Sequence, residues 1–430
     1  MVTAAAATCA MTGLVLAVRP AGSPAPLRPA AHSVTAPAPE PPGAADVAVP
    51  PVPPVPPAPQ PGTEPAAAAP WGDAGAVPPA NVPPAAVPPA AGPPATLPAA
   101  SAGTECAASG KTSCRNLLTT NAGKVAYYSN YSLDGSPAIT HAIIMVHGAG
   151  RNAQSSFQGI RAEAVRTKTN AETIVIAPSY QTKEDNPGAG QVTWPDQAWK
   201  EGGDSDSGNL SSFDVMDLIM ARLVDKNRFP NLNWVTLGGH SAGGQFTQRY
   251  AAGGKIPAQT RGVQFNFIVA NPSSYLYFTP DRPLAGSGGG IKFGPVSVGS
   301  CGEYDDYKYG LKNRVRYMKE VSDADLVSRY THARVMYLSG GADTGDESLD
   351  EDCGAMLQGK NRLIRSINYF NYIRTKFPGA PHERAQVSGT GHDRESMFAS
   401  PEAERVVFGV PVNQARASRR TDTESGSSDN

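Results

Sequence analysis

A serine lies between two glycines in the segment Gly239-His240-Ser241-Ala242-Gly243. The apolar and β-branched residues 234–237 before it predict a buried strand, and residues 245–252 after it predict a helix. So tight a turn between strand and helix leaves no room for a Cβ at either glycine, and it exposes the serine hydroxyl at the carboxyl edge of a sheet. Ser241 is therefore a candidate nucleophile. The alternative is a serine that caps a glycine-rich helix.

A serine hydroxyl needs a base to remove its proton, and the base needs a third group to orient it. Among the seven histidines, only His392 lies on a glycine-rich loop after the last predicted strand, residues 384–387. Asp343 follows the preceding predicted strand through two glycines. We expect His392 to be the base and Asp343 the orienting acid, with Asp346 as the alternative acid. The alternative for the histidine is a polar surface or core residue, and the alternative for the aspartates is a solvated acidic loop.

Backbone amides must stabilise the oxyanion that such a reaction forms. Ala242 directly follows the candidate nucleophile and supplies one amide. The second is expected from Ala149 or Gly150, on the loop after an apolar strand predicted at residues 142–146, because small residues let the backbone approach a substrate.

Three further residues are candidate substrate contacts because they border these segments. They are His147, which begins the loop of Ala149 and also suits a role in shaping it, His240 and Tyr275. Aromatic residues in two loops would suit an acyl or aryl ester, although packing beneath a loop explains them equally well. These residues are Trp194, Trp199, Tyr275, Tyr277 and Phe278.

Taken together, these motifs resemble the α/β-hydrolase superfamily, in particular its secreted esterase- and lipase-like members. The resemblance rests on His147-Gly148, the 239–243 turn, Asp343 and His392, in the chain order Ser, Asp, His. It spans about residues 124–410 and implies a Ser-Asp-His hydrolase that forms an acyl-enzyme and needs no metal or organic cofactor. The loop reads HGAG where some lipases and esterases have HGGG, which leaves the subfamily open.

The expected function is therefore hydrolysis of a small-molecule or polymeric carboxylic ester outside the cell. A peptidase or amidase with the same triad is one alternative, because the chemistry is shared. A catalytically silent binding domain displayed on a cell-wall spacer is another, although such a domain would have no need of all three groups.

Strands and helices alternate along the chain around these residues. Apolar runs predict buried strands at 142–146, 173–177, 234–237, 265–270 and 334–338. A last strand is expected at 384–387. Residues 124–133 alternate as in an antiparallel edge strand. Amphipathic or periodic segments predict helices at 160–168, 213–226, 245–252, 361–377 and from 395. The pattern predicts an α/β fold with a mostly parallel sheet and helices on both faces. The candidate site is expected at the carboxyl ends of the strands of this sheet.

Residues 281–330 interrupt this alternation as an insertion with little periodicity until its end. Its glycine-rich segment, residues 286–294, superficially suggests a phosphate loop but lacks the Lys-Ser/Thr ending and the strand–helix setting. A surface hairpin or lid hinge is expected there instead.

The remainder of the 430-residue chain has another composition. Residues 19–105 are mostly Pro, Ala, Gly and Val, which offer too little apolar side-chain area to offset the entropy of ordering, so a disordered spacer is expected. Residues 1–18 suit a signal peptide or short anchor, and residues 414–430 a disordered tail. Residues 106–413 remain for one catalytic domain.

The net charge of −1 and the lack of basic runs argue against nucleic acid or an anionic membrane as a partner. The proline-rich spacer suits association with a cell wall or cell surface. Cysteines in the catalytic domain favour a secreted or cell-surface location, since disulfides persist in oxidising compartments. Among the possible pairings we favour Cys106 with Cys114 and Cys301 with Cys353. A zinc site and free buried thiols are the alternatives.

Overall fold

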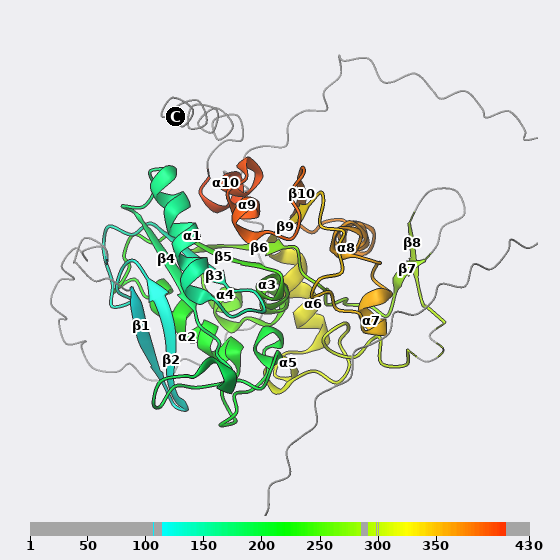
Figure 1. The fold of residues 1–430 in the computed structure, drawn as a ribbon, viewed down its shortest axis with the longest axis horizontal. Coiled ribbons are helices and arrows are strands. Elements are labelled where there is room, and N and C mark those ends of the chain that lie inside the picture. The colour runs from blue at the N-terminus through cyan, green and yellow to red at the C-terminus, as the bar shows by residue number, and fades with distance from the viewer. Residues whose placement is uncertain (1–105, 107–113, 285–290, 298, 300, 410–430) are drawn as a thin grey trace, which may run out of the picture. The chain divides into compact units, whose positions relative to one another are not determined.

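The computed structural model describes residues 106, 114–284, 291–297, 299 and 301–409 (Figure 1). The expected signal segment (1–18), spacer (19–105) and tail (414–430) lie outside the described residues.

A sheet of eight strands runs through the domain in the order β1-β2-β4-β3-β5-β6-β9-β10. β2 pairs antiparallel with both β1 and β4, and all other neighbours are parallel. The strands are β1 (Arg115–Thr120), β2 (Gly123–Ser129), β3 (His141–Val146), β4 (Thr173–Pro178), β5 (Trp234–His240), β6 (Gln264–Ala270), β9 (Arg334–Gly340) and β10 (His382–Val387). The mostly parallel sheet confirms the expectation from the apolar runs.

The predicted edge strand is not at the edge. β2 is the second strand, because β1 pairs along its outer side. β1 was not predicted since its sequence, RNLLTT, is largely polar and buries Leu118 alone.

Helices cover both faces of the sheet (Figure 1). On one face, a large apolar cluster joins alternate side chains of β3, Ile144 and Val146, to Phe246 and Tyr369. The helices over it are α2 (Ser212–Val224), α3 (Ala242–Gly253) and α8 (Arg362–Lys376). Met145 of β3 points the other way, toward Phe398. The helices on that face are α1 (Ala153–Arg166), α9 (Arg394–Phe398) and α10 (Pro401–Val407).

The insertion carries short elements of its own. They are an antiparallel hairpin of β7 (Arg282–Leu284) and β8 (Lys292–Gly294), then α5 (Arg316–Lys319) and α6 (Asp323–His332). β8 agrees with the hairpin expected at residues 286–294, and residues 285–290 lie outside the described part. Other short elements are η1 (Lys183–Asp185), η2 (Ala198–Glu201), α4 (Lys255–Gln259) and α7 (Cys353–Met356).

Two disulfides join Cys106 to Cys114 and Cys301 to Cys353, which confirms the favoured pairing. The second ties the insertion to α7. Within the described part of the chain, no helix has the length and apolar character needed to cross a membrane.

Candidate active site

Ser241 stands at the junction of β5 and α3. Its backbone has φ 59° and ψ −120°, a strained conformation for a residue with a side chain. The residue occupies the N-cap position of α3, yet its side chain makes no capping hydrogen bond. The capping alternative is therefore wrong, and the half-buried hydroxyl is free for another use.

The flanking glycines are required by close backbone approaches. A Cβ on Gly239 would collide with the backbone of Gly243, and a Cβ on Gly243 would collide with the carbonyl oxygen of Val146 at the end of β3. Because the colliding atoms belong to the backbone, they have no easy way to move aside. The tight turn that the sequence predicted is thus enforced by the packing of α3 against β3.

His392 and Asp343 meet although they lie on different loops. The imidazole Nδ1 is 2.9 Å from Asp343 Oδ2. A carboxylate only accepts hydrogen bonds, so Nδ1 carries the proton and Nε2 is left as the basic nitrogen. The Asp343 side chain is 1% exposed and the His392 side chain 28% exposed. Asp346, the alternative acid, is exposed to solvent.

The His392 ring lies beside the Ser241 turn. Its centroid is 4.5 Å from the ring centroid of His240, the residue directly before the serine. Within the described residues, no hydrogen bond joins the Ser241 hydroxyl to the His392 imidazole. Catalytic hydrogen bonds of this kind commonly tighten only when substrate binds.

A buried arginine balances the charge of Asp343. Arg362 Nη1 is 3.7 Å from the other carboxylate oxygen, Oδ1, and both side chains are 1% exposed. The same guanidinium donates a hydrogen bond to the Glu347 carbonyl at 2.7 Å. The pair avoids an isolated buried charge. Sequence reasoning missed Arg362, because a charged residue in the first turn of a helix gives no local sign of burial.

The loop after β3 lies beside the serine. A Cβ placed on Gly148 would be 3.9 Å from the Ser241 Cβ. The backbone N–H groups of Ala149 and Gly150 have no acceptor among the described residues. Ala242 begins α3, where the first amides have no intrahelical partner. The backbone donors predicted for an oxyanion thus belong to segments that adjoin Ser241.

An ion pair that the sequence did not reveal holds this loop. Arg151 donates to both carboxylate oxygens of Asp185, at 2.6 and 3.1 Å. Its Nη1 also donates to the Ala149 carbonyl at 3.1 Å, and its backbone N–H to the Gly148 carbonyl at 3.0 Å. These bonds use the carbonyl groups of the loop and leave the amides of Ala149 and Gly150 unpaired.

His147 packs beneath the loop, where its side chain is closed to solvent. Its side chain is fully buried. Nδ1 lies 2.9 Å from the Gly148 carbonyl, to which it donates, and Nε2 accepts the Tyr180 N–H at 3.1 Å. Burial lowers the pKa of His147 to about 4, so the ring is neutral. The expected substrate contact is corrected to a role in shaping the loop.

The expected aromatic wall is part of the core. Tyr275 is fully buried and stacks on Tyr369 with ring centroids 4.3 Å apart. Trp199 is fully buried and packs on the His147 ring at 4.5 Å. Trp194 and Tyr277 are also fully buried, and Phe278 is 6% exposed. Packing beneath the loops, the alternative reading, explains these residues, and Tyr275 is not a substrate contact.

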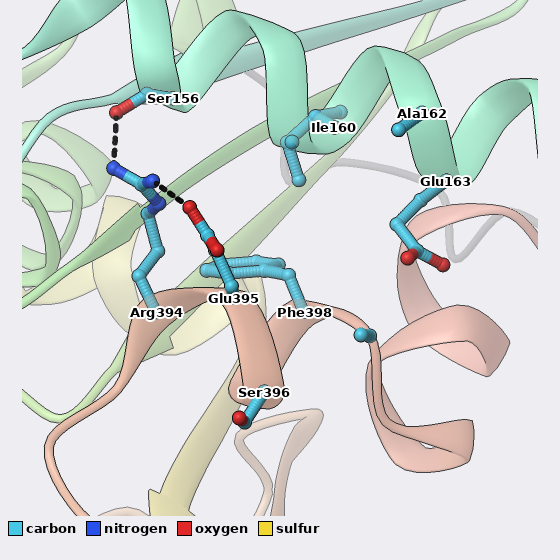
Figure 2. A pocket seen from close by; sticks show the side chains of 10 residues that line it. Ser156, Ile160, Ala162, Glu163, Arg394, Glu395, Ser396 and Phe398 are labelled. Carbon is cyan, nitrogen blue, oxygen red and sulfur yellow. Dashed lines mark hydrogen bonds and ion pairs between the residues drawn. The ribbon is translucent and has the colours of Figure 1, made fainter.

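Arg394, two residues after His392, anchors the histidine loop to α1. Its guanidinium donates to the hydroxyls of Ser155 and Ser156 at 2.7 and 3.1 Å. Figure 2 shows this arginine on the wall of a pocket of about 400 Å³ that also borders Ile160 and Phe398. None of the three candidate catalytic side chains lines that pocket. Across the described residues, no group of three or more His, Cys, Asp or Glu side chains is placed to hold a metal ion.

Comparison with known proteins finds similarity in structure alone. Poly(aspartic acid) hydrolase-1 from Sphingomonas sp. KT-1 superposes with a TM-score of 0.50 at 21% identity, over 69% of this chain and 98% of that one. A poly(3-hydroxybutyrate) depolymerase from Bordetella parapertussis gives a TM-score of 0.49 at 19% identity, over 72% of this chain and 95% of that one. No protein-family model and no curated protein matches the sequence. Together with the strand order, the first likeness confirms the expected α/β-hydrolase fold.

Proposed function

We propose that this protein is a serine hydrolase that cleaves carboxylic esters through an acyl-enzyme. The proposal is carried by one arrangement. Ser241 stands at a strained turn without a capping hydrogen bond, and the imidazole that Asp343 contacts at 2.9 Å lies beside the preceding residue, His240, with the ring centroids 4.5 Å apart. A capping or structural serine has no need of an oriented base. A binding domain would have no use for a buried, charge-balanced carboxylate behind that base.

In the proposed reaction, Ser241 Oγ attacks the ester carbonyl carbon while His392 Nε2 takes the hydroxyl proton. The amide of Ala242 and that of Ala149 or Gly150 donate to the oxyanion. The tetrahedral intermediate collapses as His392 returns the proton to the leaving alcohol. Water then loses a proton to His392 and attacks the acyl carbon, and the acid leaves as the serine recovers its proton. Asp343 holds the imidazole in the tautomer that each step requires.

We also propose that the enzyme acts outside the cell or at its surface. The two disulfides support an oxidising location. Export of the full chain, followed by sequencing of the mature amino terminus, tests this part. A cytosolic protein with reduced cysteines would contradict it.

The activity is tested with short-chain aryl esters and a serine-directed phosphonate. We expect turnover and labelling of the wild type, and a loss on the order of 10⁴- to 10⁶-fold in Ser241→Ala. Matched anilides in the same assay separate ester from amide hydrolysis. A panel of polymers, including poly(aspartic acid) and poly(3-hydroxybutyrate), extends the test to polymeric substrates. A wild type that neither turns over nor is labelled would favour the binding-domain alternative.

A further inference from the structure

Asn271, directly after β6, lies where the loops of the three proposed catalytic residues meet. Its side chain is 1% exposed. Its φ of 44° falls in the left-handed region, which asparagine tolerates better than most residues. Its backbone N–H donates to the Leu338 carbonyl of β9 at 3.0 Å. A buried residue held in a sparsely populated conformation is a candidate for a role at the site.

The Asn271 side chain reaches all three loops. Its Oδ1 accepts the backbone N–H of Gly340 at 2.9 Å, at the start of the loop of the proposed acid. Its Nδ2 lies 3.2 Å from Nε2 of His240, the residue before the proposed nucleophile. The same nitrogen donates a longer bond, 3.5 Å, to the carbonyl of Gly391, the residue before the proposed base. One side-chain amide therefore links the three loops, whose relative positions must be fixed for the reaction to occur.

These contacts also fix the proton of His240. The Gly340 N–H can only donate, so the amide oxygen of Asn271 must face it and the NH₂ group must face His240. Nε2 of His240 is then an acceptor, and its proton sits on Nδ1. Burial, followed by the neighbouring His392 and the positive charges of Arg394 and Arg362, lowers the pKa of His240 well below its usual value.

We propose that Asn271 is a positioning residue for the hydrolase reaction, which holds the three loops together and keeps His240 neutral beside His392. The inference rests on the proposed function. His392 must accept a proton from Ser241 with its ring centroid 4.5 Å from that of His240. A charged His240 would repel the imidazolium that forms, whereas a neutral ring does not. Among the described residues, the charged groups around this pair include Arg362 from α8, Arg394 from α9 and the carboxylates of Asp343 and Asp393.

The test replaces Asn271 by aspartate, which has nearly the same shape but no N–H for His240. We expect kcat to fall by about 10- to 100-fold through misplacement of the reacting groups, with KM changed by less than about threefold. A carboxylate facing Nε2 also draws a proton onto His240, so a second ionisation should enter the acid limb of the pH profile of kcat/KM. A merely structural asparagine would not change that limb.

Asn266→Asp is the matched control. Asn266 lies near the amino end of β6, the strand that Asn271 directly follows, and is 3% exposed. We expect this variant, once folded, to keep a kcat within about twofold of wild type and the wild-type pH profile. Equal kcat in the two variants, or a reduced kcat of Asn271→Asp with an unaltered acid limb, would overturn the inference alone. A wild type without turnover or phosphonate labelling would overturn the proposed function as well.

A measurement on the wild type keeps the inference testable if Asn271→Asp does not fold. Long-range ¹H–¹⁵N spectra of the histidine rings, assigned with His240→Gln, report which nitrogen carries the proton. We expect the His240 signals to show a proton on Nδ1 and no titration at the usual histidine pKa. A proton on Nε2, or titration near the usual histidine pKa, would overturn the inference.

Discussion

Asp343 and Asp346 are three residues apart in one loop but occupy opposite environments. Asp343 is buried against Arg362 and bonded to His392, whereas Asp346 is exposed. The proposed orienting role therefore belongs to Asp343. An asparagine at that position has the same shape, but its NH₂ group can donate to Nδ1 and hold the imidazole in the wrong tautomer.

We predict that Asp343→Asn lowers kcat by about 10⁴-fold with little change in fold. Asp346→Asn removes an equal charge from the same loop and should leave kcat within about twofold of wild type, because a solvated charge is screened. Steady-state kinetics on an aryl ester measures both. A larger loss in Asp346→Asn than in Asp343→Asn would show that the acid had been assigned to the wrong residue.

At the scale of elements, α3 and β3 approach so closely that Gly243 has no space for a methyl group. A Cβ there would meet the backbone oxygens of Val146 and His147, the two residues that lead into the loop after β3. The shift needed to relieve the clash would move Ser241 relative to the amides of that loop. A side chain at position 243 is therefore expected to lower both the stability of the protein and its activity.

We predict that Gly243→Ala destabilises the protein by about 1–3 kcal/mol or more and abolishes most turnover. Gly159→Ala is the matched control, since Gly159 lies in α1 with nothing within 4 Å of an added Cβ. That change should raise stability by about 0.5–1 kcal/mol and leave activity intact. Urea unfolding and ester turnover measure both variants. A Gly243→Ala protein as stable and active as Gly159→Ala would refute the packing argument.

The strands could be predicted where burial on both faces left a continuous apolar run, as in β3 and β4. They could not where the chain was polar, as in β1, or glycine-rich. β5 continues through Gly238 and Gly239 to His240 because its backbone pairs with β3 and β6 on both sides, whatever its own propensity.

The residues of the candidate site also fall into those that the sequence predicted and those that it did not. Ser241, Asp343 and His392 follow predicted strands and are recognisable from loop chemistry and chain order. The residues that orient or hold these three could not be predicted in this way. Arg362 and Asn271 satisfy buried partners that are distant in sequence, and such pairings have no periodicity from which they could be read. Tyr275 was wrongly predicted as a substrate contact, because an aromatic residue after a strand suits a pocket and a core equally.

At the scale of the whole molecule, the two disulfides close loops of very different length. Cys301 and Cys353 are separated by 52 residues and Cys106 and Cys114 by 8. A longer closed loop removes more conformational freedom from the unfolded chain. The Cys301–Cys353 bridge also joins the insertion to α7, and the described residues of these two segments pair with no strand of the main sheet.

We predict that replacing Cys301 and Cys353 together by serine costs about 4 kcal/mol, and replacing Cys106 and Cys114 together about 2.5 kcal/mol. The second pair is the control, because each double variant loses one bridge and gains the same side chains. Urea unfolding of the oxidised proteins gives both values. Equal losses, or a larger loss for the short bridge, would mean that chain entropy does not govern their contribution.

Two buried histidines, His147 and His382, and the half-buried His141 contribute to the response of the folded state to acid. Burial lowers the pKa values of His141, His147 and His382 to about 4 each. In the unfolded chain each titrates near about 6.5, so the unfolded state binds protons more readily between these values. The free energy of unfolding is therefore unaffected above about pH 6.5 and falls as the pH drops toward 4. Each histidine adds up to about 1.4 kcal/mol per pH unit to that fall.

His382 allows this to be tested one residue at a time. Its Nε2 donates to the Tyr330 carbonyl at 2.9 Å and its Nδ1 accepts from the Tyr337 hydroxyl at 2.8 Å, a neutral pattern that glutamine can imitate. We predict that His382→Gln reduces the fall of the unfolding free energy between about pH 6.5 and 4 by the contribution of one histidine. His332→Gln, at an exposed position, should leave this fall unchanged. Urea unfolding at about pH 7, just above that window, and at about pH 6 and pH 5, within it, measures the slopes. If both variants kept the wild-type slope, protonation of His382 would not be part of the acid response, and the remaining buried histidines would have to account for all of it.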